Sequence, residues 1–490
     1  MVKHKKILKS SFIYVFLGFL APAVNFFLLP IYTRYLDKAD YAFITLALLV
    51  QTVLTPLLHV GMTGAFSRFY YDHLNDRRSL EKLLSTTLIF FVFVGLFFWG
   101  ICSLAGSWAF DKFFANEVFT FSRYGYYILV TAIVMNIQLL VLTYYRNEEM
   151  AGKYALWSVL FFLSAASSIY IGVAVLKMGA DGSIQGRMWG SVITLIPLFL
   201  FFFSGKSLNF DWKLCRTMLV YALPLVPYIL LNIAFTNFDK VLVEQKFSLS
   251  QLGEYGFAVL VASVVEIFIN SVQSAVYPQV FRFLSINGKS DANIADTFKF
   301  TIIINALVIA ALISFTGIIL HAFIDERYWD IMDYFPLLCL VYIPRLIFTV
   351  WGLPVMFFKK TKYLPFANSI SLVTGVFVGL GLIDSLGIFA LPLSLFVVQL
   401  LQCCLIFFLN NHLNIQLFAF RRLTPEYFVL FFLLIAGLGA TYIYHYLYTN
   451  VLVYIPVFFL ILLLVLALNF RSLKLLWHSV NLNKVVNKGE

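Results

Sequence analysis

The sequence predicts an all-α integral membrane protein with about fourteen transmembrane helices, built as two six-helix lobes plus a C-terminal helix pair. Three observations predict this fold: the apolar composition, a series of apolar runs of membrane-spanning length, and the placement of Lys and Arg. Of the 490 residues, 61% are hydrophobic and only 12% are charged, whereas soluble domains carry about 25% charged residues. The net charge of +11 does not indicate nucleic-acid binding, because the basic residues lie in short connections between apolar runs. A soluble fold is therefore excluded.

Fourteen apolar runs are long enough to cross a bilayer, which takes about 20 residues of α-helix. The first seven lie near residues 11–35, 42–63, 83–105, 123–144, 154–176, 186–203 and 217–238. The other seven lie near residues 255–276, 300–322, 333–357, 363–383, 386–409, 427–447 and 451–470. The alternating pattern of barrel strands is missing from the sequence, so the runs predict helices. Asp239 and Lys240 interrupt the seventh run, and the sequence leaves its end open.

The Lys and Arg residues predict the orientation of these helices. With the N-terminus in the cytoplasm and an even number of spans, most of the 35 basic residues fall in cytoplasmic connections, as the positive-inside rule requires. Both termini are therefore expected in the cytoplasm, and the connection at 106–122 outside. The first run is too long for a signal peptide and is interpreted as the first helix.

An internal repeat relates the two halves of the chain. The stretch DYAFITL, beginning at Asp40, matches EYGFAVL, beginning at Glu254, and at the same offset Arg68 matches Arg282. These matches predict two lobes in the same orientation, related by an axis along the membrane normal. Alternatively, they are only the aromatic and basic residues common at helix ends. The predicted boundaries are 1–204 for the N-lobe, 205–410 for the C-lobe, and 411–490 for the helix pair and cytoplasmic tail.

Three further stretches carry a family resemblance: FFLLPIYTRYLDKADYAFITL from Phe26, GMTGAFSRFYYD from Gly61, and YYRNEEMAGKYA from Tyr144. With them the chain resembles the polysaccharide transporters, the Wzx-type O-antigen flippases of the multidrug/oligosaccharidyl-lipid/polysaccharide exporter superfamily. The resemblance implies that the protein moves undecaprenyl-pyrophosphate-linked oligosaccharide from the cytoplasmic to the outer leaflet of the bacterial inner membrane. It implies alternating access, driven by an ion gradient, in the synthesis of lipopolysaccharide O-antigen.

The resemblance also implies partners. They are the lipid-linked oligosaccharide, membrane lipids, and polysaccharide polymerase or assembly proteins, with the transporter itself a monomer. No metal or organic cofactor is expected, because the five cysteines show neither zinc-ligand nor CxxC spacing. A proton or sodium gradient is the candidate energy source.

Two charged residues lie in the middle of predicted spans, where a charge costs about 2.5–3.5 kcal/mol on insertion scales and usually faces a cavity or a partner. They are Glu266 and Arg345. The planar fork of Arg345 suits a pyrophosphate, and Glu266 is a candidate for carrying the coupling ion. Pro344 is expected to kink the helix beside Arg345. Alternatively, Glu266 and Arg345 form an ion pair that joins their two helices.

Other polar residues are candidates for lining the cavity. Asn25 and Asp239 occupy equivalent positions of the repeat, and Lys240 follows Asp239. Arg68 and Arg282 are predicted to form a matched basic rim at the cytoplasmic entrance. Alternatively, the asparagine makes an ordinary hydrogen bond between helices, and the two arginines reach the membrane interface as many helix-end arginines do.

The sequence leaves three other functions to weigh. An enzyme is not predicted, since the longest external connection holds no carboxylate cluster or nucleophile. A multidrug cation antiporter of the same superfamily commonly carries an acid in the first helix, which is missing here from residues 12–35. A lipid II flippase also has fourteen helices and is the main alternative.

Overall fold

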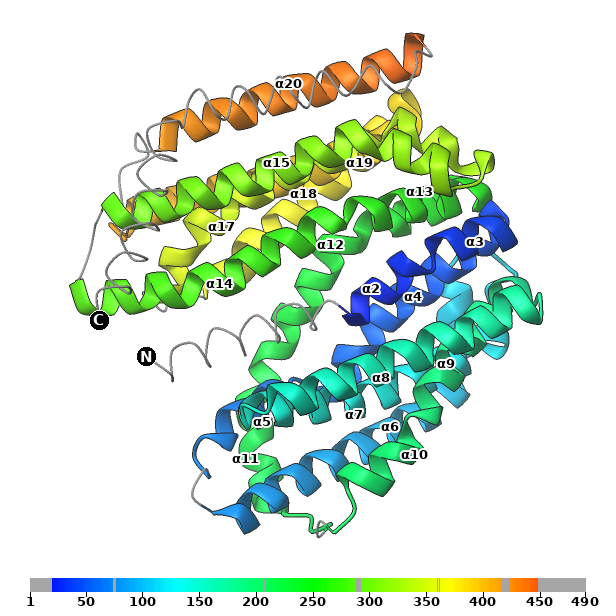
Figure 1. Ribbon diagram of the computed structural model, residues 1–490, viewed down its shortest axis with the longest axis vertical. Coiled ribbons are helices and arrows are strands. Elements are labelled where there is room, and N and C mark those ends of the chain that lie inside the picture. The colour runs from blue at the N-terminus through cyan, green and yellow to red at the C-terminus, as the bar shows by residue number, and fades with distance from the viewer. Residues whose placement is uncertain are drawn as a thin grey trace, which may run out of the picture. The chain divides into compact units, whose positions relative to one another are not determined.

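The computed structural model describes residues 20–73, 76–205, 208–287, 292–358, 360, 362–415 and 423–447. Every regular element within these residues is a helix (Figure 1), which confirms the all-α membrane fold. The chain divides into two compact units, Met1–Phe257 and Ala258–Glu490, and each is described by itself. The lobe boundaries expected from the repeat, at 204 and 410, stay predictions.

Within the described residues, ten helical stretches are long and apolar enough to cross a membrane. They are Lys38–His59, Arg77–Phe113, Phe121–Asn147, Ala151–Val175, Gly179–Phe202, Val226–Lys246, Leu249–Gln273, Ile294–Phe315, Phe335–Phe357 and Tyr363–His412. The last of them contains two of the expected spans, separated by a turn at Gly387–Phe389. A shorter apolar stretch, Thr424–Gly439, belongs to the helix Thr424–Leu447. The span expected at 451–470 lies outside the described residues, as does much of the one at 11–35.

The first unit contains the elements α2 to α12 and the start of α13. Their bounds are α2 (Leu20–Phe27), α3 (Leu29–Tyr35), α4 (Lys38–His59), α5 (Met62–Tyr70), α6 (Arg77–Phe113), α7 (Tyr126–Asn147), α8 (Ala151–Tyr170), α9 (Gly179–Ile193), α10 (Leu195–Pro197), α11 (Trp212–Ala222), α12 (Val226–Lys246) and α13 (Leu249–Ala262). Figure 1 shows α6, α7, α8 and α9 running side by side, and α7 packs against α4, α6, α8 and α9. The helix α7 is therefore central to this unit.

A left-handed turn separates α4 from α5. The helix α4 ends at His59, and the next two residues, Val60 and Gly61, have φ of 49° and 71°. A side chain on Gly61 would be strained at this φ, and its Cβ would lie 3.0 Å from the carbonyl oxygen of Ala222. Glycine therefore permits both the turn and the close approach of α11.

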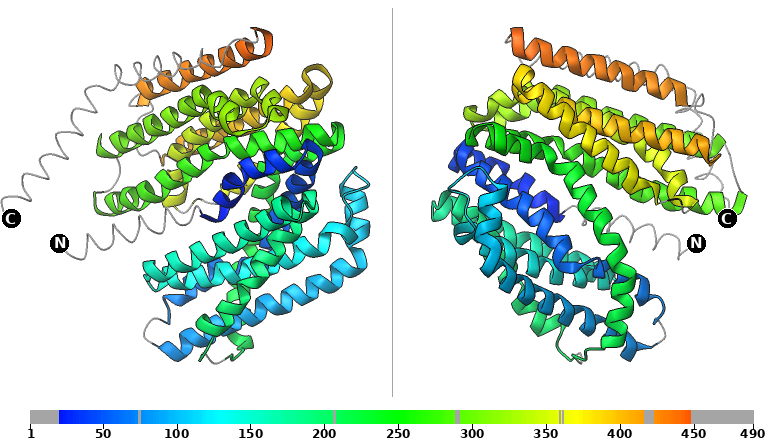
Figure 2. Two further views of the ribbon diagram at one scale, coloured as in Figure 1. Left: turned by 45° about the vertical axis from the view of Figure 1, so that its right-hand side comes forward. Right: turned by 180° about the vertical axis from the view of Figure 1, so that it is seen from behind.

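The seventh expected span is a bent helix, whose end the sequence left open. The helix α11 ends at Ala222, a short turn holds Pro224, and α12 continues to Lys246 through Asp239 and Lys240. Proline offers no backbone N–H to the preceding turn, which accounts for the break. Figure 2 shows the two helices following one another through the unit.

The connections of the first unit gather at two ends, as expected for helices that alternate in direction. At one end, Lys82 lies 2.7 Å from Asp211, and Ser85 donates to the carbonyl of Asn209 at 2.7 Å. The ion pair with Lys82 lowers the pKa of the Asp211 carboxyl, which also accepts the N–H of Leu214 at the start of α11. At the other end, Asp40 of α4 accepts the N–H of Ala180 in α9 at 3.3 Å, and Lys38 of α4 lies 3.2 Å from Glu254 of α13. Glu244 of α12 accepts N–H groups from the connection after α6.

The second unit contains the rest of α13 and the elements α14 to α20. Their bounds are α14 (Val264–Asn287), α15 (Ala292–Phe323), α16 (Phe335–Leu340), α17 (Tyr342–Phe357), α18 (Tyr363–Leu386), α19 (Ala390–His412) and α20 (Thr424–Leu447). The helix α19 packs along α18 and α17, and α15 packs along α14, α17 and α20 (Figure 1). Buried amides join these helices: Asn410 donates to the carbonyl of Trp351, and Gln402 donates to Asn368.

Candidate functional site

Three glycines allow α9 to pack closely against the preceding helical stretch, Ala151–Val175. Gly182, Gly186 and Gly190 are spaced four residues apart and share one face of α9. A Cβ at any of them would overlap backbone atoms, of Gly172, of Ser168 and Ile169, or of Ser164 and Ala165. The Ser164 hydroxyl donates to the carbonyl of Gly190 at 2.7 Å, which fixes the register of α8 against α9.

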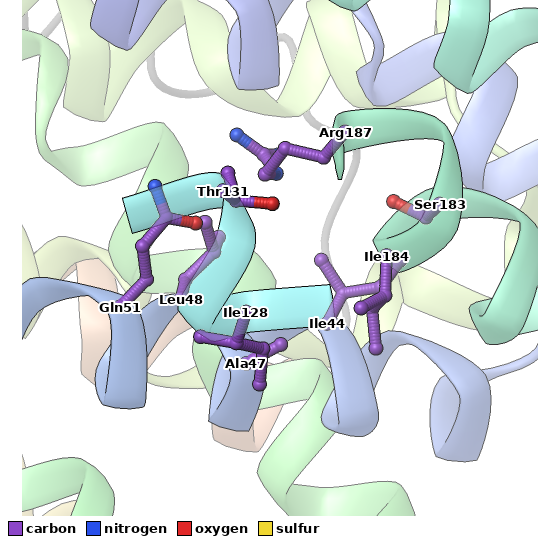
Figure 3. Close-up of a pocket in the computed structure, with 9 residues that line it drawn as sticks. All are labelled: Ile44, Ala47, Leu48, Gln51, Ile128, Thr131, Ser183, Ile184 and Arg187. Atoms are coloured by element: carbon purple, nitrogen blue, oxygen red, sulfur yellow. The ribbon is translucent and has the colours of Figure 1, made fainter. Parts of the chain in front are cut away.

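A small pocket lies between α4, α7 and α9. Its lining comprises Ile44, Ala47, Leu48 and Gln51 of α4, Ile128 and Thr131 of α7, and Ser183, Ile184 and Arg187 of α9 (Figure 3). Spacings of three and four residues place the members from each helix on one face of that helix. The cavity volume is about 10 Å³, close to the space that one water needs. The pocket is therefore a narrow recess, lined by apolar side chains and by the polar Gln51, Thr131, Ser183 and Arg187, and is too small for a lipid headgroup.

Arg187 is the charged residue of this pocket. Its guanidinium donates to the side-chain oxygen of Asn25 on α2 and lies close to the Tyr32 hydroxyl on α3. Tyr32 in turn shares a hydrogen bond of 3.0 Å with Ser183, one helical turn before Arg187. In Figure 3 the Arg187 side chain extends from α9 toward the helix that carries Thr131. Residues of α2, α3 and α9 therefore hold the guanidinium in place.

No carboxylate forms a salt bridge with Arg187 within the described part of the chain. The Arg187 side chain is half-buried in a membrane-spanning helix, and the oxygens near its guanidinium, from Asn25 and Tyr32, are neutral. An arginine offers five N–H donors, more than Asn25 and Tyr32 can accept. Because planar guanidinium groups bind phosphate oxygens in pairs, the arrangement suits an anionic phosphate ligand.

Asp239 and Lys240 lie together on α12, as adjacent residues. Asp239 is 1% exposed and accepts a 2.9 Å hydrogen bond from the Tyr255 hydroxyl of α13, while Lys240 lies 3.8 Å from its other oxygen. Lys240 also donates to Asn237 at 3.0 Å. The described contacts of Asp239 do not include Asn25, so the two equivalent positions of the repeat make different bonds. Asn25 accepts a hydrogen bond from Arg187, whereas Asp239 accepts one from Tyr255.

Glu266 and Arg345 are both half-buried in the second unit, and no salt bridge between them exists in the described residues. Glu266 lies in the first turn of α14, where the helix dipole favours a negative charge. The guanidinium carbon of Arg345 lies 5.5 Å from the centre of the Phe348 ring, a cation–π contact. Two helices, α16 and α17, meet at Val341, next to the carbonyl of Leu340 that Pro344 cannot bond. A bend of the helix axis there, which the sequence predicts, stays a prediction.

The predicted cytoplasmic rim is described only in part. Arg68 is exposed near the end of α5 and pairs with Asp72 at 2.6 Å, one helical turn later. Arg282 lies in α14, and its side chain is outside the described residues. The matched rim stays a prediction.

Sequence reasoning missed Arg187 as a site residue. The hydropathy of GADGSIQGR is low, so the sixth span was expected to begin at 186, which placed Arg187 at a helix end. The structure begins α9 at Gly179 and so places Arg187 within the span. The four-residue glycine spacing was the signal in the sequence that a closely packed membrane helix starts earlier.

Comparisons with known proteins agree with this fold. A family model described as "Polysaccharide biosynthesis protein" matches residues 7–284, more than half of the chain. A protein of the Lsg locus of Haemophilus influenzae is 23% identical over 288 residues, which cover 57% of this chain and 67% of the relative.

Solved transporter structures share the fold at low sequence identity. A structure of the lipid II flippase MurJ in an inward closed conformation has a TM-score of 0.68 at 13% identity, covering 97% of this chain and 99% of that chain. An inward-facing multidrug transporter of the MATE family, in the MOP superfamily, has a TM-score of 0.67 at 13% identity, covering 80% of this chain and 94% of that chain. The fold is that of multi-pass membrane transporters.

Proposed function

We propose, because this chain belongs to the polysaccharide biosynthesis protein family, that it moves undecaprenyl-pyrophosphate-linked oligosaccharide from the cytoplasmic to the outer leaflet of the bacterial inner membrane. Alternating access driven by an ion gradient is the proposed mechanism, with both termini in the cytoplasm. The protein acts on its substrate without chemical conversion, and therefore as a transporter rather than an enzyme.

One observation carries the proposal: Arg187 is a half-buried arginine in a membrane helix with no carboxylate partner in the described residues. A guanidinium is costly in a membrane, and a passing anion gives a reason to retain it. A pyrophosphate that enters the low-dielectric core loses its hydration, and a fixed cation offsets part of that cost. Its hydrogen bond to Asn25, beside the nearby Tyr32 hydroxyl, holds the guanidinium in place, and its remaining N–H groups are the proposed donors to the pyrophosphate.

Arg345 is the corresponding candidate in the second unit, because it too forms no salt bridge within the described residues. It makes a cation–π contact with Phe348, and its charge acts on the Tyr277 hydroxyl. Asp239 and Lys240 are further candidates for lining the path. Arg68 and Arg282 are candidates for attracting the headgroup at the cytoplasmic entrance, and Glu266 for carrying the coupling ion.

A lipid II flippase is the second candidate, since lipid II is likewise an undecaprenyl pyrophosphate and the MurJ structure covers nearly the whole chain. A cation antiporter is less favoured, because the positive charge of Arg187 would repel a cationic drug. Deleting the gene distinguishes the first two: loss of a surface polysaccharide with normal cell growth favours the oligosaccharide, and lysis from arrested peptidoglycan synthesis favours lipid II.

The role of Arg187 is tested in the deletion strain by complementation. Arg187→Gln is expected to reduce surface polysaccharide at least tenfold, and Arg187→Lys partially, because lysine keeps the charge but loses the fork. Arg123→Gln is the matched control, since Arg123 lies in the same unit and already pairs with Asp181 at 2.9 Å. Normal export by Arg187→Gln, at normal membrane amounts, would remove Arg187 from the transport path.

A further inference from the structure

The connection that leads into α11 exposes three apolar side chains in a row of alternate residues. Leu208, Phe210 and Trp212 are 56%, 43% and 66% exposed, and the rings of the last two lie with centroids 6.3 Å apart. The backbone at Asp211 is extended, and successive side chains of an extended backbone point to opposite sides. The three apolar side chains therefore share one side of this connection.

The backbone of the same connection is fixed to the start of α6. The Ser85 hydroxyl donates to the carbonyl of Asn209 at 2.7 Å, and the N–H of Asp211 donates to the Thr86 hydroxyl at 3.1 Å. The Asp211 carboxylate lies 2.7 Å from Lys82. The exposed apolar side chains thus belong to a segment whose backbone is held on its other side.

The outer side of α11 continues this exposed surface. Cys215, Met218 and Ala222 form the buried side of the helix, which packs against α5 and α6 (Figure 1). The exposed side carries residues at helical spacing, which are Trp212, Lys213, Arg216, Val220 and Leu223. From Lys213 to Val220, and again from Arg216 to Leu223, the distance along the helix is about 10 Å. Basic side chains therefore stand at the start of the exposed side and apolar ones deeper along it.

Lys213 and Arg216 differ from the basic residue beside them. Lys82 forms a salt bridge with Asp211, whereas neither Lys213 nor Arg216 forms one within the described residues. The positive-inside rule predicts that this end of the first unit faces the cytoplasm. Anionic phospholipids give the cytoplasmic leaflet a negative surface potential, which is complementary to two unpaired cations.

We propose that this surface, formed by the outer side of residues 208–223, binds an anionic phospholipid of the inner leaflet. The headgroup phosphate lies at Lys213 and Arg216, and an acyl chain lies along Val220 and Leu223. Trp212 sits at the level of the headgroups, where amphipathic rings are favoured. A zwitterionic headgroup carries an ammonium group that offsets its phosphate, so a headgroup with net negative charge binds more tightly.

A lipid bound here fixes the depth in the membrane of the connection between the sixth and seventh spans. None of the residues of this surface lines the pocket of Arg187. The inference therefore does not depend on which substrate the protein transports.

The test measures tryptophan fluorescence of the purified full-length protein in phosphatidylcholine vesicles that contain brominated phosphatidylglycerol or brominated phosphatidylcholine. Bromine quenches a tryptophan that it contacts, so the difference between the wild type and Trp212→Phe reports the lipid beside Trp212. Phosphatidylglycerol is expected to bind there about fivefold more tightly than phosphatidylcholine, and high salt should weaken this preference. Equal quenching by the two lipids overturns the proposal.

Two pairs of substitutions, each made with and without Trp212→Phe, test the basic residues. Lys213→Gln with Arg216→Gln should abolish the preference, and both side chains are exposed, so the fold should be kept. Arg146→Gln with Lys153→Gln is the matched control, because it removes two exposed charges from α7 and α8 at the same predicted end. An unchanged preference in the first pair, or an equal loss in both pairs, contradicts binding at Lys213 and Arg216.

A competition experiment separates the phospholipid from the transported lipid. Unbrominated undecaprenyl pyrophosphate, added at a few mole per cent, is not expected to relieve the quenching at Trp212. Relief would assign the surface to the transported lipid and overturn the proposal, whether or not the protein proves to be a flippase.

Discussion

Lys38 Nζ lies 3.2 Å from Glu254 Oε2, at the starts of α4 and α13, and the two side chains are only 18% and 11% exposed. Around this ion pair the Tyr41 ring packs on Phe257 with centroids 5.7 Å apart. A Cβ at Gly253 would overlap the carbonyl of Lys38. The residues DYAF and EYGF, which form the clearest match of the predicted repeat, therefore lie against each other.

Lys38 and Glu254 are expected to separate during transport. Both residues lie at the end of the first unit that is predicted to face outward, and alternating access requires that end to open. In a variant without the five natural cysteines, Lys38→Cys with Glu254→Cys should be joined by a short bis-maleimide. Joining them should abolish export of the polysaccharide. Arg77→Cys with Glu81→Cys is the control, since that pair lies one helical turn apart on α6 and should tolerate the link. Undiminished export by the fully linked Lys38–Glu254 variant would show that this contact stays closed throughout transport.

Close packing of α9 on α8 predicts a stability difference between two glycines. Gly190→Ala should destabilise the protein by about 1–3 kcal/mol, because its Cβ would overlap the backbone of Ser164 and Ala165. Gly152→Ala meets nothing within 4 Å and should leave stability unchanged or raise it, since alanine favours helix. Thermal unfolding in detergent measures both. Equal Tm values for the two variants would mean that α9 does not approach α8 as the structure has it.

The predicted orientation is tested by reporter fusions. The connections of the first unit alternate between its two ends, and the positive-inside rule assigns the end with Asn116 to the outside. A fusion of alkaline phosphatase at Asn116 should be active, and one after Glu490 inactive. Green fluorescent protein at the same two positions provides the reciprocal control, since it fluoresces in the cytoplasm. An active phosphatase after Glu490 would rule out an even number of spans.

Glu266→Gln tests the coupling role proposed for Glu266. With no salt bridge to Arg345 in the described structure, the substitution strands no charge and should leave the protein folded. Transport in vesicles should then lose its dependence on the sodium or proton gradient. Asp384→Asn, in an exposed acid at the end of α18, is the control and should keep the dependence. If Glu266→Gln retains the full gradient dependence, the coupling ion binds elsewhere.

The sequence predicted the membrane fold well, because span length and the placement of charges are set by the bilayer and not by tertiary contacts. Local breaks were predictable where one residue causes them, as Pro344 does after Leu340. The end of the seventh span was not predictable, because the buried Asp239 accepts a hydrogen bond from Tyr255, which lies 16 residues later in the chain. Such a partner lets a charged residue remain inside a helix.

The site was harder to predict than the fold. Mid-span charge identified Glu266 and Arg345 but missed Arg187, because glycine-rich sequence lowers the hydropathy that defines a span. The bond from Arg187 to Asn25 joins residues 162 positions apart. Hydropathy and spacing carry no information on contacts of that range, so the role of Asn25 became visible only in the structure.

Translocation in proteoliposomes tests the central proposal most directly. Purified protein is reconstituted with undecaprenyl-pyrophosphate-linked oligosaccharide in both leaflets, an ion gradient is imposed, and a glycosidase that cannot cross the membrane is added outside. Vesicles without protein, and vesicles with Arg187→Gln, should yield only the half of the oligosaccharide that faces outward. Wild-type vesicles should yield nearly all of it. Cleavage that stops at one half with the wild type, in vesicles of proven protein content, would contradict the assignment of this chain as an oligosaccharide-lipid flippase.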